Sequence, residues 1–159
     1  MTTPVTAYVA LGSNLGDREA HIRAGITALG HEPQVTVTRV STLRETAAEG
    51  APGPPYLNGA LALTTTLSPA NLLARLLAIE AAEGRVRTTP LGPRTLDLDL
   101  LVHGDYVGDR AGLTVPHPRL AERRFVLEPL AEIAPDIVVP GLGATAAELL
   151  ARLRKDPCG

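Results

Sequence analysis

The stretch AYVALGSNLGD, residues 7–17, joins a strand to a helix and sets the interpretation of the rest of the chain. Its first five residues are mostly apolar and suit a strand, and the glycine-containing run at residues 12–16 predicts a turn that ends the strand. Asp17 is a favourable N-cap for a following helix. Apolar residues then recur at helical spacing up to Gly30, where we expect the helix to end.

Further elements follow from the same signals of periodicity, capping and turn residues. Strands are expected over residues 35–41, 58–66 and 95–102, and loops over residues 47–55 and 85–93. A second helix is expected to be capped by Ser68, to begin with Pro69 and to end at Gly84. The order strand, helix, strand, strand, helix, strand predicts an α+β fold of the ferredoxin-like, split βαβ type, an antiparallel sheet with two helices on one face. From residue 113 onward we expect C-terminal additions, with Pro-punctuated segments and a final helix over about residues 145–153. We expect residues 1–159 to form a single domain.

Composition narrows the class of protein. Hydrophobic residues make up 45% and charged residues 20%, as in soluble globular proteins, and the net charge of −2 gives no support for a nucleic-acid or anionic-membrane binder. The lone Cys158 excludes an intramolecular disulfide, and with no leader or membrane span expected, the chain is predicted to be cytoplasmic. Only three tyrosines and one phenylalanine are present, so the core must be aliphatic and a flat ligand has few stacking partners.

The sharpest local signal is GPRTLDLDLL at residues 92–101. Alternate residues of a strand share a face, so Asp97 and Asp99 project together, with Cα atoms roughly 7 Å apart. Two carboxylates at this spacing suit magnesium, which is commonly held by one or two carboxylates together with phosphates and waters. A solvated strand face would give the same pattern. Aspartate is nevertheless a poor strand former, and two of them within an aliphatic run call for a reason.

Basic residues surround this acid pair. Arg94 lies next to it, and Arg85 and Arg87 lie in the loop upstream; guanidinium groups bind phosphate oxygens in forked geometry. His117 stands between two prolines that stiffen the backbone, so its imidazole could donate to a phosphate or bond a nearby carbonyl. A phosphoryl-transfer site and a structural salt-bridge cluster both remain open on local grounds.

Three further positions carry weaker signals. Tyr56 and Asn58 share a strand face and would suit a heteroaromatic ligand with an amide-like edge, although a tyrosine at a sheet edge explains them equally. Glu80 lies about one helical turn before Gly84 and Arg85, close to the expected phosphate-binding loop. A charge on the protein surface is the alternative interpretation. The run at residues 12–18 lacks the features of a P-loop or a dinucleotide fingerprint and is interpreted as a structural turn.

Taken together, the motifs resemble those of hydroxymethyl-dihydropterin pyrophosphokinases along nearly the whole chain. The matching segments are residues 10–16, 56–58, 79–80, 84–87, 92–99, 115–119 and 125–127. The resemblance implies a ferredoxin-like fold, two magnesium ions, and transfer of the terminal two phosphates of ATP to the hydroxymethyl group of a dihydropterin, releasing AMP. We expect a monomer, with a dimer as the alternative, whose partners are these small molecules and neither nucleic acid nor membrane.

The resemblance also implies roles for individual residues. Asp97 and Asp99 would be the metal ligands, and the catalytic set would add Arg85, Arg94 and His117. ATP would be bound by Glu80, Arg85, Arg87, Arg94, Leu100, Thr114, His117 and Arg123. The pterin would lie between Tyr56 and Phe125, with its edge bonded by Asn58 and by backbone groups near Thr46 and Ala47.

The chain departs from the family pattern at a few positions, and two rival functions remain. Pro90 and Leu91 stand where Arg-Trp is usual, Leu77 where glutamine is common, and Arg44 where an aromatic residue is common. One rival is a nucleotidyl transferase or cyclase, because a paired-acid site on such a sheet also suits attack at the α-phosphorus. The other is a ligand-binding module without turnover.

Overall fold

The computed structural model describes residues 3–14, 16–46, 55–83, 96–110 and 113–155. The elements in chain order are β1 (Val5–Ser13), α1 (Arg18–Gly30), β2 (Val35–Val40), β3 (Arg44–Thr46), β4 (Tyr56–Thr65), α2 (Pro69–Ala82), β5 (Asp97–His103), β6 (Gly108–Arg110), β7 (Leu113–Val115), the 3-10 helix η1 (Leu120–Glu122), α3 (Arg124–Ile133), β8 (Val138–Val139), β9 (Ala144–Thr145) and α4 (Ala146–Lys155).

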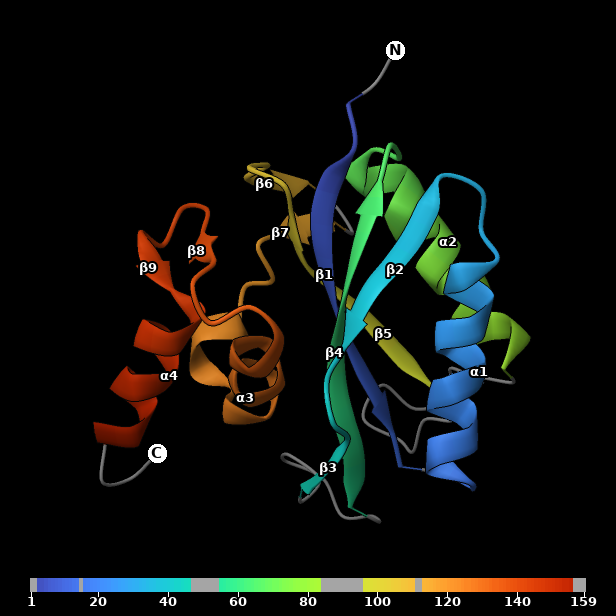
Figure 1. The fold of residues 1–159 in the computed structure, drawn as a ribbon, viewed down its shortest axis with the longest axis horizontal. Coiled ribbons are helices and arrows are strands. Elements are labelled where there is room, and N and C mark those ends of the chain that lie inside the picture. Colours follow the sequence, from blue (N-terminus) through green and yellow to red (C-terminus); the bar gives the residue numbers. More distant parts are fainter. Residues whose placement is uncertain (1–2, 15, 47–54, 84–95, 111–112, 156–159) are drawn as a thin grey trace.

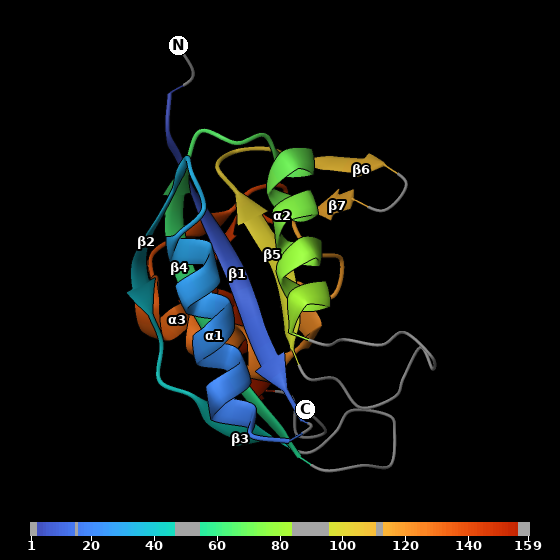
Figure 2. The same cartoon turned by 90° about the vertical axis from the view of Figure 1, so that its right-hand side faces the viewer.

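The central sheet is antiparallel throughout. Its strand order is β2-β4-β1-β5, and the short β3 also pairs with β4. Helices α1 and α2 cover one face, and α3 and α4 lie on the opposite side (Figures 1 and 2). The α+β class, the antiparallel sheet and the order of the long elements are therefore confirmed, with β3 as an unexpected short strand. The narrower ferredoxin-like classification stays a prediction.

Both predicted helix starts are confirmed by their caps. The side chain of Asp17 accepts a hydrogen bond from the backbone N–H of Ala20 at 3.1 Å, and Ser68 accepts one from Asn71 at 3.1 Å. Each bond satisfies an N–H group that has no partner within the first turn of its helix. Helix α1 ends at Gly30, as expected from the sequence.

The two faces of the sheet are packed with side chains of different size. On β4, Leu61 and Leu63 enter the aliphatic core beneath α1 and α2, whereas Ala60 and Ala62 contact Ile133 of α3. This confirms the alternation expected for the strand and shows that both faces are buried. Small residues on the α3 side allow that helix to approach the sheet closely.

Two expectations from the sequence were wrong. Strand β1 does not end at Leu11 but continues to Ser13, because Gly12 is paired on both sides, with Asn58 on β4 and Asp97 on β5. Helix α3 lies where only Pro-punctuated segments were expected, and it contains Pro129. Val126, Leu130 and Ile133 are buried at helical spacing, and this packing outweighs the hydrogen bond that the proline cannot make.

Within the described parts of the chain, no helix is both long and apolar enough to span a membrane.

Neighbouring leucines on α2 give a matched test of the core. Leu76 is completely buried, whereas Leu77 is 41% exposed. We expect Leu76→Ala to lower the free energy of unfolding by about 2–5 kcal/mol, because it removes buried methyl groups and leaves a cavity. Leu77→Ala should change it by about 0.5 kcal/mol. Urea unfolding of both variants checks this, and equal losses would contradict the packing described here.

Candidate active site

A row of four residues crosses the sheet at the end of β1. Arg44 on β3 pairs with Asn58 on β4, Asn58 pairs with Gly12 on β1, and Gly12 pairs with Asp97 on β5. Directly opposed residues in an antiparallel sheet point to the same face. The row therefore places an amide and a carboxylate on the α3 side of the sheet, on either side of a residue that has no side chain.

Gly12 forms the floor of this site. A Cβ atom at this position would lie 3.3 Å from Asn58 Oδ1, 3.6 Å from Tyr56 Cδ1 and 3.8 Å from the Cβ of Asp97. Three side chains thus converge over the glycine. Tyr56 and Asn58 do share a face, as the sequence predicted. The interpretation of residues 12–18 as only a structural turn was wrong for Gly12, which is a strand residue within the site.

The acid pair lies as its alternation predicted. Leu98 and Leu100 are buried in the core beneath α1 and α2, so Asp97 and Asp99 project from the other face of β5. Asp97 is half-buried and Asp99 is exposed. No group of three or more potential metal ligands occurs among the described residues. Two carboxylates fit magnesium, whose remaining ligands are commonly phosphate oxygens and water.

His117 is brought to the acid pair by a hydrogen bond to an irregularity in β5. The register between β1 and β5 shifts at Leu101, and the Leu101 carbonyl accepts the backbone N–H of His117 at 3.0 Å. Burial lowers the pKa of His117; Asp99 opposes this shift, and Arg123 and Arg119 add to it. The Nδ1 atom accepts the Arg119 backbone N–H at 3.2 Å, so the neutral ring carries its proton on Nε2.

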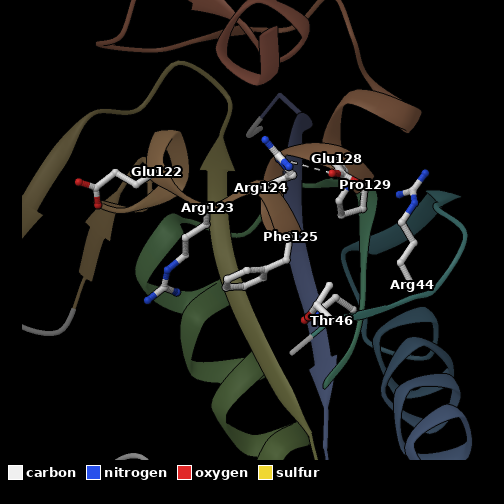
Figure 3. A pocket seen from close by; sticks show the side chains of 9 residues that line it. Arg44, Thr46, Glu122, Arg123, Arg124, Phe125, Glu128 and Pro129 are labelled. Atoms are coloured by element: carbon white, nitrogen blue, oxygen red, sulfur yellow. Dashed lines mark hydrogen bonds and ion pairs between the residues drawn. The ribbon is translucent and has the colours of Figure 1, made fainter. Parts of the chain in front are cut away.

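A cavity of about 260 Å³ opens beside this row. Its lining consists of Arg44, Thr46, Asn58, Glu122, Arg123, Arg124, Phe125, Glu128 and Pro129. Phe125 and Thr46 face one another across part of it, and Arg124 turns away toward Glu128 (Figure 3). The amide nitrogen of Asn58 donates to the Thr46 hydroxyl, which leaves Oδ1 directed toward Gly12. The cavity therefore offers an aromatic ring and polar acceptors to a ligand.

Charged groups adjoin the aromatic side of the cavity. The guanidinium carbon of Arg123 lies 5.5 Å from the centroid of the Phe125 ring, within the range of a cation–π contact. Three of the residues predicted to bind a pterin, namely Thr46, Asn58 and Phe125, thus lie around one cavity. Tyr56 reaches the Gly12 floor instead, and its place opposite Phe125 around a ligand stays a prediction.

Helix α3, which carries Phe125, is tied to the β2–β3 side of the sheet. Glu132 accepts hydrogen bonds from Thr42 N at 2.8 Å, from Thr42 Oγ1 at 2.7 Å and from Arg44 Nη2 at 2.8 Å. Arg39 also donates to the Ile133 carbonyl at 2.7 Å. Burial alone would raise the pKa of Glu132, but the hydrogen bonds from Thr42 and the charge of Arg44 outweigh it and lower this pKa.

The other predicted site residues lie in different surroundings. Glu80 is buried and accepts the Leu98 backbone N–H at 2.7 Å. The Leu100 side chain is in the core, so only its backbone could contact ATP, and the Thr114 hydroxyl donates to Asp109 at 2.9 Å. Ala47, Arg85, Arg87 and Arg94 lie outside the described residues. The pterin contact of Ala47 therefore stays a prediction. The same holds for the ATP contacts of the other six residues, which are Glu80, Arg85, Arg87, Arg94, Leu100 and Thr114.

Two residues of the site were not assigned from the sequence. A glycine within a strand marks a close approach of another group, and this signal could have identified Gly12. Arg44 was noted only as a departure from an aromatic residue. Its guanidinium lies beside Glu132, a pairing between distant segments that local sequence does not indicate.

Paired carboxylates, a histidine held beside them and an aromatic-lined cavity on one face of an antiparallel sheet define a candidate metal- and nucleotide-dependent transferase. Comparisons with known proteins make this more specific. Residues 8–135 match the family described as 7,8-dihydro-6-hydroxymethylpterin-pyrophosphokinase (HPPK). The chain therefore belongs to this family.

Individual relatives agree with this assignment. The chain is 46% identical to the 2-amino-4-hydroxy-6-hydroxymethyldihydropteridine pyrophosphokinase of Synechocystis sp. over 91% of its length and 74% of the relative's. It is also 46% identical to the protein of that name from Pseudomonas aeruginosa, over 91% and 89% of the two chains. The structure of Plasmodium falciparum HPPK-DHPS with pteroate matches with a TM-score of 0.75 at 13% identity, over 96% of this chain and 43% of that one. At this identity, the structural likeness shows the fold alone.

The contacts of Glu132 predict a pH-dependent contribution to stability. Its lowered pKa means that the contribution is present above the pKa of an unfolded glutamate, about 4.3, and is lost as the pH falls through the folded pKa. We expect Glu132→Gln to be less stable than the parent at pH 7, with a smaller difference at pH 3.5. Urea unfolding at both pH values measures this, and a difference that does not change with pH would contradict it.

Proposed function

We propose that this protein transfers a diphosphate group from ATP to the hydroxymethyl group of 6-hydroxymethyl-7,8-dihydropterin, giving the pterin diphosphate and AMP. Membership of the HPPK family and the names of its relatives support this activity, a step of folate biosynthesis. The observation that carries the proposal is the row Asn58, Gly12 and Asp97, which joins an aromatic cavity to an acid pair on one face. A ring bound beside Asn58 would direct its substituent over Gly12 toward the carboxylates.

The cavity residues would bind and orient the pterin. Phe125 offers a ring face for stacking, and Asn58 Oδ1, whose amide is oriented by Thr46, offers an acceptor for an N–H group of the ring edge. Holding the hydroxymethyl oxygen in line with the β-phosphorus reduces the entropy cost of the reaction. Backbone groups near Thr46 and Ala47 complete the edge contacts of the proposal.

The acid pair would hold magnesium together with the phosphates of ATP, and we propose two ions. When bound, magnesium neutralises phosphate charge and lowers the pKa of the attacking hydroxyl, so no side-chain base is required. The two carboxylates project side by side from β5, and Asp99 is the more exposed of the two. Both carboxylates would therefore be available to hold cations together with the phosphates of ATP.

His117 and the arginines would stabilise charge on the phosphates. Burial lowers the pKa of His117, and the Arg119 N–H donates to its Nδ1 atom, so the neutral ring would present its Nε2–H to a phosphate oxygen. Arg123 adds a cation on the same side of the sheet. Arg85, Arg87 and Arg94 belong to the proposal as further phosphate ligands, with Leu100 and Thr114 as other contacts to ATP.

Other features of the proposal concern the protein as a whole. Residues 1–159 would act as one pyrophosphokinase domain, in the cytoplasm, as a monomer or a dimer. The partners would be ATP and the dihydropterin, without nucleic acid or membrane. A nucleotidyl transferase or a non-catalytic module would fit the acid pair, but neither accounts for the family membership of the chain.

Product analysis tests the reaction and the acid pair together. The parent protein with MgATP and the dihydropterin should release AMP, whereas free pyrophosphate would indicate nucleotidyl transfer. Asp97→Ala and Asp99→Ala should remain folded and lose at least about 100-fold in kcat, because each removes a carboxylate that would hold the metal. Asp105→Ala, in the exposed turn that follows β5, is the matched control and should retain activity. Activity of either site variant within about tenfold of the parent would refute the metal role.

The proposed contact of Phe125 with the pterin can be tested separately from the binding of ATP. Phe125→Ala should raise KM for the dihydropterin by about fivefold and change KM for MgATP by about twofold or less, since an aromatic stacking contact is worth about 1 kcal/mol. Phe125→Tyr retains the ring and should stay close to the parent. Steady-state kinetics with each substrate varied in turn measures both effects. An equal rise in both KM values would contradict a pterin-specific role.

A further inference from the structure

Strand β5, which carries the acid pair, is an edge strand of the central sheet. Among the residues that the structure describes, the strand order β2-β4-β1-β5 gives it one neighbour, β1. In an antiparallel pair, residues alternate between those that exchange hydrogen bonds with the neighbour and those that do not. On an edge strand, the N–H groups of the second kind point away from the sheet and lack a strand partner.

Leu98 is a residue of this second kind, and its N–H group is satisfied by a side chain. It lies between Asp97 and Asp99 and is paired in register with Leu11. Its N–H donates to Glu80 Oε2 at 2.7 Å, a short bond to a carboxylate oxygen. Helix α2 thus supplies an acceptor at the point where the sheet has no further strand.

Glu80 is an unusual residue for its position on the helix. It is 2% exposed and lies on the buried face of α2 together with Leu72, Leu76 and Ile79. A carboxylate is costly to bury unless it is hydrogen-bonded, so the bond to Leu98 gives a physical reason for an acid among these aliphatic residues. The Leu98 side chain is itself 2% exposed in the same core, so this residue is fixed through both its backbone and its side chain.

We propose that Glu80 is a positioning residue that holds the Asp97–Asp99 pair in place by accepting the N–H group of Leu98. The role given to the acid pair rests on the proposed function, whereas the Glu80–Leu98 contact does not. Glu80 then acts through the backbone of β5, and this role replaces the direct contact to ATP that the family resemblance implies for it. Loss of the acceptor would loosen the strand edge and allow the two carboxylates to move relative to His117, which is tied to the next part of the same strand at Leu101.

Two substitutions separate these roles. Glu80→Gln keeps a carbonyl oxygen at the same reach and removes the charge, whereas Glu80→Asp keeps the charge and shortens the side chain by one methylene. Glu83→Gln removes a negative charge from the same end of α2, where Glu83 pairs with His21, and serves as the control. The measurements are hydrogen exchange of the Leu98 amide, Mn²⁺ binding in the presence of an ATP analogue, and kcat with KM for each substrate.

If Glu80 positions the strand, Glu80→Gln should retain Leu98 protection and stay within about threefold of the parent in kcat. Glu80→Asp should lose that protection, bind Mn²⁺ more weakly and lose about tenfold or more in kcat, with KM for the dihydropterin little changed. Glu83→Gln should resemble the parent.

Other outcomes are equally informative. An inactive Glu80→Gln with a protected Leu98 amide overturns the proposal, as does a fully active Glu80→Asp, because either result points to the charge. If both variants are inactive, the exchange of the Leu98 amide decides. Loss of its protection from hydrogen exchange in both variants supports the positioning role, whereas retained protection in either variant overturns that role. If the parent releases no AMP but Glu80→Asp alone loses Leu98 protection and Mn²⁺ binding, the proposed function fails and the positioning role stands.

Discussion

The pairing of β1 with strands on both of its sides is the constraint on which the site depends. β4 and β5 are far apart in the sequence, yet Gly12 holds Asn58 and Asp97 at fixed positions on either side of itself. Neighbouring strands lie about 4.8 Å apart, so the Cα atoms of Asn58 and Asp97 are separated by about 10 Å across the sheet, and their side chains converge over Gly12. A shift of one residue in either pairing would turn Asn58 or Asp97 to the opposite face and remove it from the site.

The unequal packing of the two faces determines where a ligand can bind. Leucines fill the space beneath α1 and α2, whereas Ala10, Ala60 and Ala62 leave the opposite face shallow. Helix α3 packs against this shallow face at its C-terminal end, where Ile133 meets the alanines and Glu132 is bound by Thr42 and Arg44. The N-terminal end of α3 carries Phe125 to the cavity, where the ring also packs against the neighbouring apolar cluster, and the contacts of Glu132 and Ile133 about two turns away anchor the other end of the same helix.

Much of this architecture could be predicted from the sequence because the signals are local. The caps Asp17 and Ser68 fix the helix starts, and the alternation around Asp97 and Asp99 fixes which face they occupy. Features that depend on distant partners were missed. The extension of β1 through Gly12 requires strands on both sides, and Pro129 concealed α3, whose stability comes from burial against the sheet and α4. The contact of Glu80 with Leu98 likewise joins a helix to a strand edge that no local pattern identifies.

Gly12 shows how the site and the stability of the fold compete. Glycine in a strand interior costs about 0.5–1 kcal/mol relative to alanine, and β-branched residues would suit this paired position still better. Folding alone would therefore favour a side chain here. A Cβ atom, however, would lie 3.3 Å from Asn58 Oδ1 and would occupy the space over which Tyr56, Asn58 and Asp97 converge. The glycine keeps this space open, and under the proposed function a ligand that reaches from the aromatic cavity to the acid pair would cross the sheet at this residue.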